Sequence, residues 1–163
     1  MERGSGRRTP LDRLELKVPP PVVTLAVGVL MWGVGRWLPA FQVALPMRRG
    51  LAVAFALAGI ALVGACALRF RRAGTTVNPM APAKASVLVD AGFYRFSRNP
   101  IYLGDALILV GWGLWLANLA SLAAIAVFVA YLNRFQIEPE ERALRAAFGG
   151  DFDAYRTRVR RWI

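Results

Sequence analysis

Three long apolar stretches alternate with blocks of charged residues along this chain. The first stretch runs from Val22 to Leu38 and contains Arg36 near its end, and the second, from Leu51 to Leu68, has no charge. The third runs from Ile101 to Asn133 with one charge, Asp105. Because a helix needs about 17–25 apolar residues to cross the hydrocarbon core of a bilayer, the pattern predicts an all-α membrane protein.

The third stretch is too long for one crossing and too short for two crossings with a long loop. A tight hairpin that turns near Asn118 would give two spans of about 17 residues each, at the short end of the usual range. A single long, tilted helix is the alternative. The hairpin makes the chain a polytopic membrane protein with four transmembrane helices, of which the last two form a tight hairpin.

The basic residues distinguish these two topologies. Lys and Arg number 21 against 10 Asp and Glu, and cytoplasmic loops of membrane proteins carry an excess of Lys and Arg. Four crossings place the basic residues of the N-terminal tail, the second connection and the C-terminal stretch on one side, and leave Arg36, Arg48 and Arg49 on the other. Three crossings would put the C-terminal arginines outside. The distribution therefore favours four crossings with both termini cytoplasmic.

At 163 residues the chain has room for one domain. We divide residues 1–163, a single membrane domain, into a cytoplasmic tail (1–21), the first two spans (22–73) and a patterned remainder (74–163). Within the remainder, Gly74 to Asp90 is rich in Pro, Thr and Asn, which is typical of a loop.

Short cytoplasmic amphipathic helices are expected after the last span. Pro139 cannot continue a helix without a break but suits the first turn of a new one, and Gly149-Gly150 would end that helix. Asp151 is a plausible N-cap for a last helix. One face of this helix would carry Phe152, Tyr155, Val159 and Trp162.

Composition excludes several classes of site. A sequence pI near 11.3 is compatible with nucleic-acid binding, but basic blocks beside apolar stretches are already explained by membrane topology, so no nucleic-acid partner is expected. Cys66 is the only cysteine, which excludes an intrachain disulfide. The chain has no histidine, the usual general base and commonest metal ligand, so we expect no metal site.

Two polar clusters border the predicted hairpin. One extends from Tyr94 to Asp105 at the start of the third stretch, and the other from Arg134 to Glu141 just after it. Because a hairpin brings its two ends together, the clusters should be neighbours in space. Together they would surround a pocket, open to cytosol and lipid, with arginine, carboxylate, amide and phenol groups.

The first cluster contains Arg98-Asn99-Pro100-x-Tyr102-x-Gly104, which resembles the Arg-His-Pro-x-Tyr-x-Gly motif of the isoprenylcysteine carboxyl methyltransferase family and its phospholipid methyltransferase relatives. The resemblance covers about residues 74–163. Gly74 to Pro79 looks like the bacterial members. The chain also resembles the second half of the family signature, at Glu140-Glu141, Leu144, Phe148-Gly149, Tyr155 and Val159-x-Arg161. Asn99 departs from the histidine of the eukaryotic motif and cannot titrate.

The resemblance implies a methyltransferase of the bacterial inner membrane that uses S-adenosylmethionine and acts on a lipophilic small-molecule or lipid acceptor arriving from the bilayer. Membrane lipids would be its other partners. It also implies that residues 74–163 bind the cofactor. Carried over by position, the cofactor-binding residues are Arg98, Asn99, Pro100, Tyr102, Gly104, Glu140 and Glu141.

Arg134 and Asp105 are the candidate catalytic residues. Arg134 could orient an anionic acceptor, or simply pair with Glu138 four residues later. Asp105 lies one turn into the third span, where an intramembrane carboxylate is a functional candidate by default, although it could also reach water. Without histidine, a carboxylate or thiol acceptor is favoured over an amine, which must lose a proton first.

Two other functions remain open at this point. Membrane sterol reductases share part of this C-terminal architecture and use a nicotinamide cofactor, and a non-catalytic membrane scaffold could have kept the fold. The sequence identifies neither the methyl acceptor nor the oligomeric state.

Overall fold

The computed structural model describes residues 14–74 and 80–163. These residues form helices and no strand. The helices are α1 (Pro20–Trp37), α2 (Arg48–Arg72), α3 (Pro100–Leu116), α4 (Leu119–Leu132), α5 (Glu138–Phe148) and α6 (Gly150–Arg158), joined by short 3₁₀ segments and one π-helix, Asn133–Ile137. Residues 1–13 of the expected tail and residues 75–79 of the bacterial-type motif lie outside the described residues.

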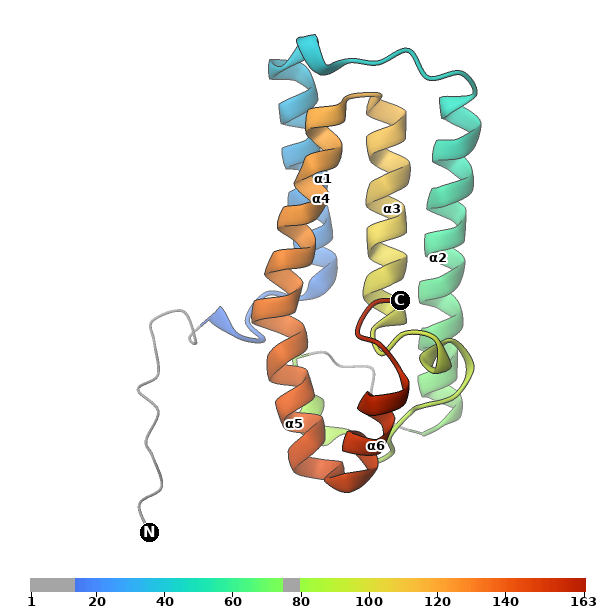
Figure 1. The fold of residues 1–163 in the computed structure, drawn as a ribbon, viewed down its shortest axis with the longest axis vertical. Helices are drawn as coiled ribbons and strands as arrows, with labels where there is room; N and C mark the ends of the chain where they lie inside the picture. The colour runs from blue at the N-terminus through green and yellow to red at the C-terminus, as the bar shows by residue number, and fades with distance from the viewer. Residues whose placement is uncertain (1–13, 75–79) are drawn as a thin grey trace.

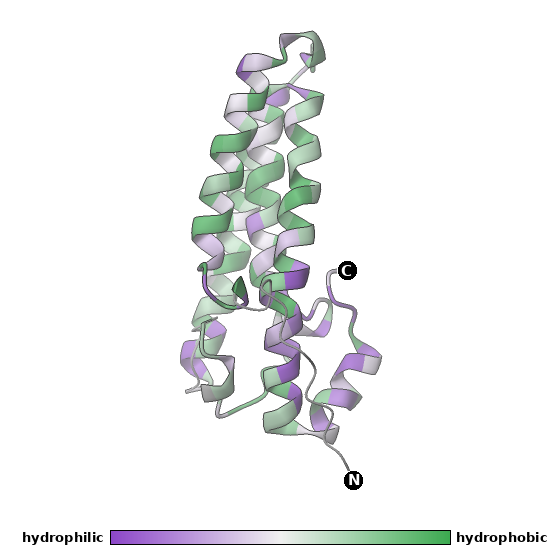
Figure 2. Cartoon of the chain, turned by 90° about the vertical axis from the view of Figure 1, so that its left-hand side faces the viewer, coloured by the Kyte–Doolittle hydropathy of each residue, from purple (hydrophilic) through white to green (hydrophobic). Residues whose placement is uncertain are grey.

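Helices α1 to α4 run alternately up and down in a bundle, with α3 between α2 and the α1–α4 pair (Figure 1). Helices α5 and α6 lie at one end, together with the start of α3 and the end of α2. Hydrophobic residues cover the bundle, and hydrophilic residues gather on α5 and α6 (Figure 2). The all-α prediction is therefore confirmed.

Length and composition identify two candidate membrane spans among the described residues, not four. These are α2 and the continuous helical stretch over residues 119–148. Helix α3 is apolar but has only 17 residues. Helix α1 has 18 residues, and the prolines at its start and Arg36 at its end lower its mean hydropathy.

The turn between α3 and α4 falls at Ala117 and Asn118, where the sequence predicted it, and excludes a single long helix. Ala117 has a left-handed backbone conformation (φ 49°), and the Asn118 side chain accepts a hydrogen bond from the Ser121 backbone N–H at 3.0 Å. Asn118 Nδ2 also donates to the Leu38 carbonyl at 2.8 Å. The buried asparagine thus caps α4 and ties the hairpin to the end of α1.

The break expected at Pro139 is absent, because α4 continues through the π-helix into α5. Proline lacks an N–H and clashes with the preceding turn, and the wider turn of residues 133–137 accommodates it at the start of α5. The stretch over residues 119–148 is about 45 Å long at 1.5 Å per residue. A hydrocarbon core is about 30 Å thick, so α5 would lie beyond the core.

The end of the chain differs from the prediction in two respects. The residue that precedes α6 is Gly149, not Asp151, and Gly149 also ends α5. Its positive φ of 53° is a conformation that glycine adopts readily because it has no Cβ. Helix α6 ends at Arg158, so Val159 and Trp162 lie in an extended tail. Phe152, Tyr155 and Val159 still form one buried cluster, whereas Trp162 packs against the main core.

Helices α2 and α3 approach each other closely through small residues. A Cβ built on Gly59 of α2 would lie 2.4 Å from the Gly104 carbonyl, and one on Gly104 would lie 2.7 Å from Val63 Cγ2. Gly104, one of the residues expected to bind the cofactor, therefore contacts a neighbouring helix. Gly104 faces α2, and its missing side chain is what lets two backbones meet.

Gly59→Ala should destabilise the protein by about 3 kcal/mol, at the upper end of the usual cost of overpacking, because the new methyl group meets backbone that cannot rotate away. Thermal unfolding in detergent measures this effect. Gly64→Ala is the matched control, since nothing lies within 4 Å of a Cβ at that position of the same helix. Equal unfolding temperatures for the two variants would contradict the close packing.

Candidate functional site

A cavity of about 330 Å³ lies at the polar end of the bundle. Both polar clusters contribute to its lining, so the prediction that they are neighbours is confirmed. Of the nine candidate catalytic and cofactor-binding residues, six line it: Arg98, Asn99, Tyr102, Asp105, Glu140 and Glu141. Their side chains come from the two residues before α3, the first turns of α3 and the first turn of α5.

The remaining walls of the cavity are mostly apolar and aromatic. Phe70 of α2 and Tyr94 meet edge to face with their ring centroids 5.4 Å apart. Phe152 and Tyr155 of α6 close other sides, together with Leu88 of the segment between α2 and α3. The Tyr155 hydroxyl donates to the Tyr94 carbonyl at 2.8 Å, which fixes α6 against the segment that leads into α3. The polar groups therefore lie among mostly apolar neighbours.

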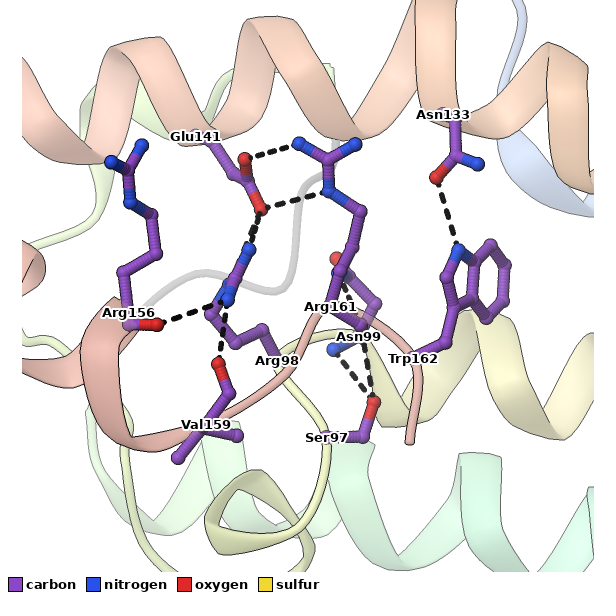
Figure 3. Close-up of polar contacts among 9 residues, drawn as sticks. All are labelled: Ser97, Arg98, Asn99, Asn133, Glu141, Arg156, Val159, Arg161 and Trp162. Atoms are coloured by element: carbon purple, nitrogen blue, oxygen red, sulfur yellow. Dashed lines mark hydrogen bonds and ion pairs between the residues drawn. The ribbon is translucent and has the colours of Figure 1, made fainter.

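Glu141 is the centre of a three-residue ion cluster (Figure 3). Arg98 Nη2 lies 2.7 Å from Glu141 Oε1, and Arg161 Nη2 lies 2.8 Å from Oε2. The side chains of Arg98 and Glu141 are only 10% and 13% exposed. Because both guanidinium groups bind the same carboxylate, the cluster joins α3, α5 and the C-terminal tail.

The ionisation of Glu141 follows from these contacts. Burial favours its neutral form, but the hydrogen bonds and charges of Arg161 and Arg98 outweigh burial and hold the pKa of the carboxyl below its usual value. The same bond raises the pKa of Arg161. Glu141 therefore stays charged at neutral pH and forms ion pairs with both arginines.

Arg98 and Asn99 also fasten the extended C-terminal tail (Figure 3). Arg98 Nη1 donates to the Val159 carbonyl at 2.5 Å, and Asn99 Nδ2 donates to the Arg161 carbonyl at 2.9 Å. The Arg98 backbone N–H donates to the Arg160 carbonyl at 2.9 Å. Asn99 thus acts as a hydrogen-bond donor to the tail, a task that requires no titration.

Asn99→Leu should weaken the attachment of the tail. The half-buried Arg161 carbonyl would lose this donor and keep only the longer hydrogen bond from Ser97 Oγ at 3.4 Å, a loss of about 1 kcal/mol. Limited carboxypeptidase digestion of the detergent-solubilised protein should remove C-terminal residues faster than in the wild type. Unchanged digestion would show that the asparagine is dispensable for holding the tail.

Glu140 has an arrangement of its own, separate from the ion cluster. Its Oε1 accepts from the Tyr102 hydroxyl at 2.5 Å and from Gln136 Nε2 at 2.6 Å. Both hydrogen bonds end on Oε1, and the residue lines the cavity. Burial raises the pKa of Glu140 to about 7, although the two hydrogen bonds oppose this shift. The carboxyl is therefore poised between its neutral and charged forms near neutral pH.

Pro100 and Arg134 lie outside the cavity lining, whereas Asp105 belongs to it. Pro100 is fully buried in the first turn of α3 and does not line the cavity. Arg134 does not line it either, and forms an ion pair with Glu15 of the segment before α1. Asp105 lies on the apolar side of the cavity, beside Thr24 of α1.

Sequence reasoning did not place Gln136 or Arg161 among the site residues. Gln136 is buried within the π-helix and reaches Glu140 four residues later. That spacing is a detectable signal, because residues four apart share a helix face. Arg161 belonged to the signature, but only the fold shows that the tail returns to Glu141.

Comparisons with known proteins identify the family of this chain. A family model described as phospholipid methyltransferase matches residues 47–151, which is more than half of the chain. A protein of Haemophilus influenzae, described only as uncharacterized, is 40% identical over 63 residues, which are 39% of this chain and the full length of that protein. No solved structure matches the chain.

Proposed function

Because the chain belongs to the phospholipid methyltransferase family, a family of membrane methyltransferases, we propose that it transfers a methyl group from S-adenosylmethionine to a lipophilic acceptor at the cytoplasmic face of the bacterial inner membrane. One observation carries the proposal. The two polar clusters at the ends of the α3–α4 hairpin line a single, mostly apolar cavity.

The cavity residues fit this cofactor. The cavity volume of about 330 Å³ falls within the range of about 300–1,000 Å³ typical of small-molecule sites. S-adenosylmethionine carries a sulfonium, an ammonium group and ribose hydroxyls, which call for acceptors and aromatic faces. Glu140 and Tyr102 would hold its polar part, and Phe70 and Tyr94 would contact its sulfonium or adenine ring. Arg98, bound by Glu141, would shape the site.

When bound, S-adenosylmethionine would supply a methyl group from its positively charged sulfur, with the demethylated cofactor as the leaving group. Side chains of the cavity have three tasks in this reaction. Glu140 offsets the positive charge when ionised, the apolar walls exclude water, and the narrow space aligns the reacting atoms. We propose a carboxylate or thiolate acceptor, because neither needs histidine as a general base.

The membrane arrangement belongs to the proposal. We propose four crossings by α1 to α4, with the cavity and both termini on the cytoplasmic side. Three observations support it: the arginine distribution, the antiparallel bundle, and the gathering of polar residues at the end that carries α5 and α6.

Ligand binding and methyl transfer together test the proposed function. The purified protein in detergent should bind S-adenosylmethionine or its demethylated product at micromolar levels by calorimetry, and membranes given methyl-labelled cofactor should yield a labelled lipid extract. Glu138→Gln changes a neighbouring carboxylate outside the cavity lining and should bind like the wild type. Stabilisation by NADPH alone would indicate a reductase instead. If neither cofactor binds, the result would indicate a non-catalytic scaffold.

A further inference from the structure

A second hollow runs between α1 and α3, on the apolar part of the bundle. This groove has a volume of about 480 Å³. Its lining includes Thr24, Gly28 and Trp32 of α1 and Ile108, Leu109 and Trp112 of α3, and none of its lining residues carries a charge. Leu25 and Val29, on its α1 edge, are 69% and 60% exposed, so the groove opens on the outer surface of the bundle, which would face lipid in the proposed membrane arrangement.

The groove continues directly from the polar cavity. Pro21 lines both spaces. On α3, Asp105 lines the cavity and Ile108, about one turn further along, lines the groove. The two spaces therefore follow the same α1–α3 seam, and the junction between them lies at Pro21, Thr24 and Asp105.

The far end of the groove is marked by two tryptophans. Trp32 and Trp112 line it there, and Trp112 Nε1 donates to the Gly28 carbonyl at 3.0 Å. The distance along α1 from Pro21 to Trp32 is about 16 Å at 1.5 Å per residue, the length of roughly a dozen extended methylene groups. The groove therefore has a defined length of about 16 Å.

Gly28 helps to keep this seam open. A Cβ at Gly28 would meet only Leu109 Cδ2, at 4.0 Å, whereas one at Gly59 in the α2–α3 seam would lie 2.4 Å from backbone. Gly28 is therefore not required for close packing. Its missing side chain instead leaves space in the floor of the groove.

We propose that this groove binds the hydrocarbon chain of the methyl acceptor, a single unbranched chain of about twelve carbons, and thereby presents its carboxylate or thiol end to the cavity beside Asp105. The assignment rests on the proposed function for the identity of the bound molecule. Its physical basis is the uncharged lining, the lateral opening to lipid, and the continuity with the cavity through Pro21.

Photo-crosslinking tests the groove without requiring turnover. The probe is a twelve-carbon carboxylic acid with a diazirine at its far end, added to the full-length protein in lipid nanodiscs. We expect saturable labelling of α1 and α3 near Trp32 and Trp112, and competition by the unlabelled acid. A six-carbon probe should not label these tryptophans, because it is too short to reach them from the cavity.

Gly28→Leu should reduce the labelling by the long probe at least tenfold, since the new side chain fills the groove floor. Gly64→Leu is the matched control: it makes the same change in an apolar helix at a position with no neighbour within 4 Å, and labelling should persist. Non-saturable labelling, equal at the exposed Leu57 and Ile60 of α2, would show bulk lipid only and overturn the proposal.

The outcome separates the groove from the proposed function. If the wild type binds S-adenosylmethionine but shows no saturable labelling, the groove assignment fails and the methyltransferase proposal stands. If labelling is saturable and sensitive to Gly28→Leu while neither cofactor binding nor methyl transfer is found, the groove is a chain-binding site and the proposed function fails.

Discussion

Arg98→Ala is expected to destabilise the protein by about 3 kcal/mol, because it breaks a buried ion cluster and leaves Glu141 with one arginine instead of two. The variant also loses the hydrogen bonds from the Arg98 side chain to the Val159 and Arg156 carbonyls. The C-terminal tail should therefore loosen, and cofactor binding should fall with it. Thermal unfolding and calorimetry of the same preparation measure both effects.

A double-mutant cycle with Glu141→Ala identifies the source of the loss. If Arg98 acts through Glu141, the two changes should be strongly non-additive, with a coupling of about 1–3 kcal/mol between residues in direct contact. Arg145→Ala is the control, since its ion pair with Asp153 is exposed and should contribute little. Additive effects of Arg98→Ala and Glu141→Ala would contradict the cluster.

The bundle was predictable because its signals are local. Apolar stretches of characteristic length predicted the long helices, and Asn118, near the middle of the third stretch, marked the turn between α3 and α4. The neighbourhood of the two polar clusters then followed from the hairpin alone. Residues Arg98, Asn99 and Glu141 could thus be placed at one end of the molecule before any contact was known.

The sequence could not predict features that depend on non-local packing. Gly104 belongs to the motif, yet which face of α3 it occupies depends on where α2 lies. Arg134 was expected near the acceptor or Glu138, but the segment before α1 returns to place Glu15 beside it. The π-helix widens the turn over residues 133–137, so regular helical spacing could not predict how α4 is oriented relative to α5.

The exposed apolar residues of α2 have a similar explanation. Leu57 and Ile60 are 61% and 58% exposed in a helix that packs on α3 through another face, which carries Ala52, Gly59 and Val63. In water such a surface would favour association. In the proposed bilayer it contacts acyl chains, which is consistent with α2 being one of the two candidate spans.

Glu140→Gln is expected to weaken S-adenosylmethionine binding roughly 30-fold, about 2 kcal/mol, because the amide cannot offset the positive charge that the carboxylate would hold. Tyr102 and Gln136 still flank the substituted side chain, so the fold should be kept. Calorimetric titration of the variant, with Glu138→Gln in parallel, measures the change. Wild-type affinity in Glu140→Gln would remove Glu140 from the site.

The pH dependence gives an independent test of Glu140. With its pKa near 7, the carboxyl is mostly protonated at pH 6, and a positively charged ligand must then displace that proton. Affinity should therefore fall about tenfold between pH 8 and pH 6 in the wild type. In Glu140→Gln this fall should vanish, and the cofactor's own titration, common to both proteins, cancels in the comparison.

The same pKa also affects stability, with the opposite dependence on pH. The folded pKa of about 7 lies above the ordinary value of 4.5, so the folded state holds the proton more tightly than the unfolded state. The stabilisation from the neutral form is complete below about pH 4.5 and is lost as pH rises through 7. Cofactor binding should thus strengthen over the pH range in which the cofactor-free protein becomes less stable. The reason is that only the ionised carboxylate attracts the ligand, whereas burial favours the neutral form. Unfolding curves at pH 6 and pH 8 with and without S-adenosylmethionine should show this reversal in the wild type and lose it in Glu140→Gln.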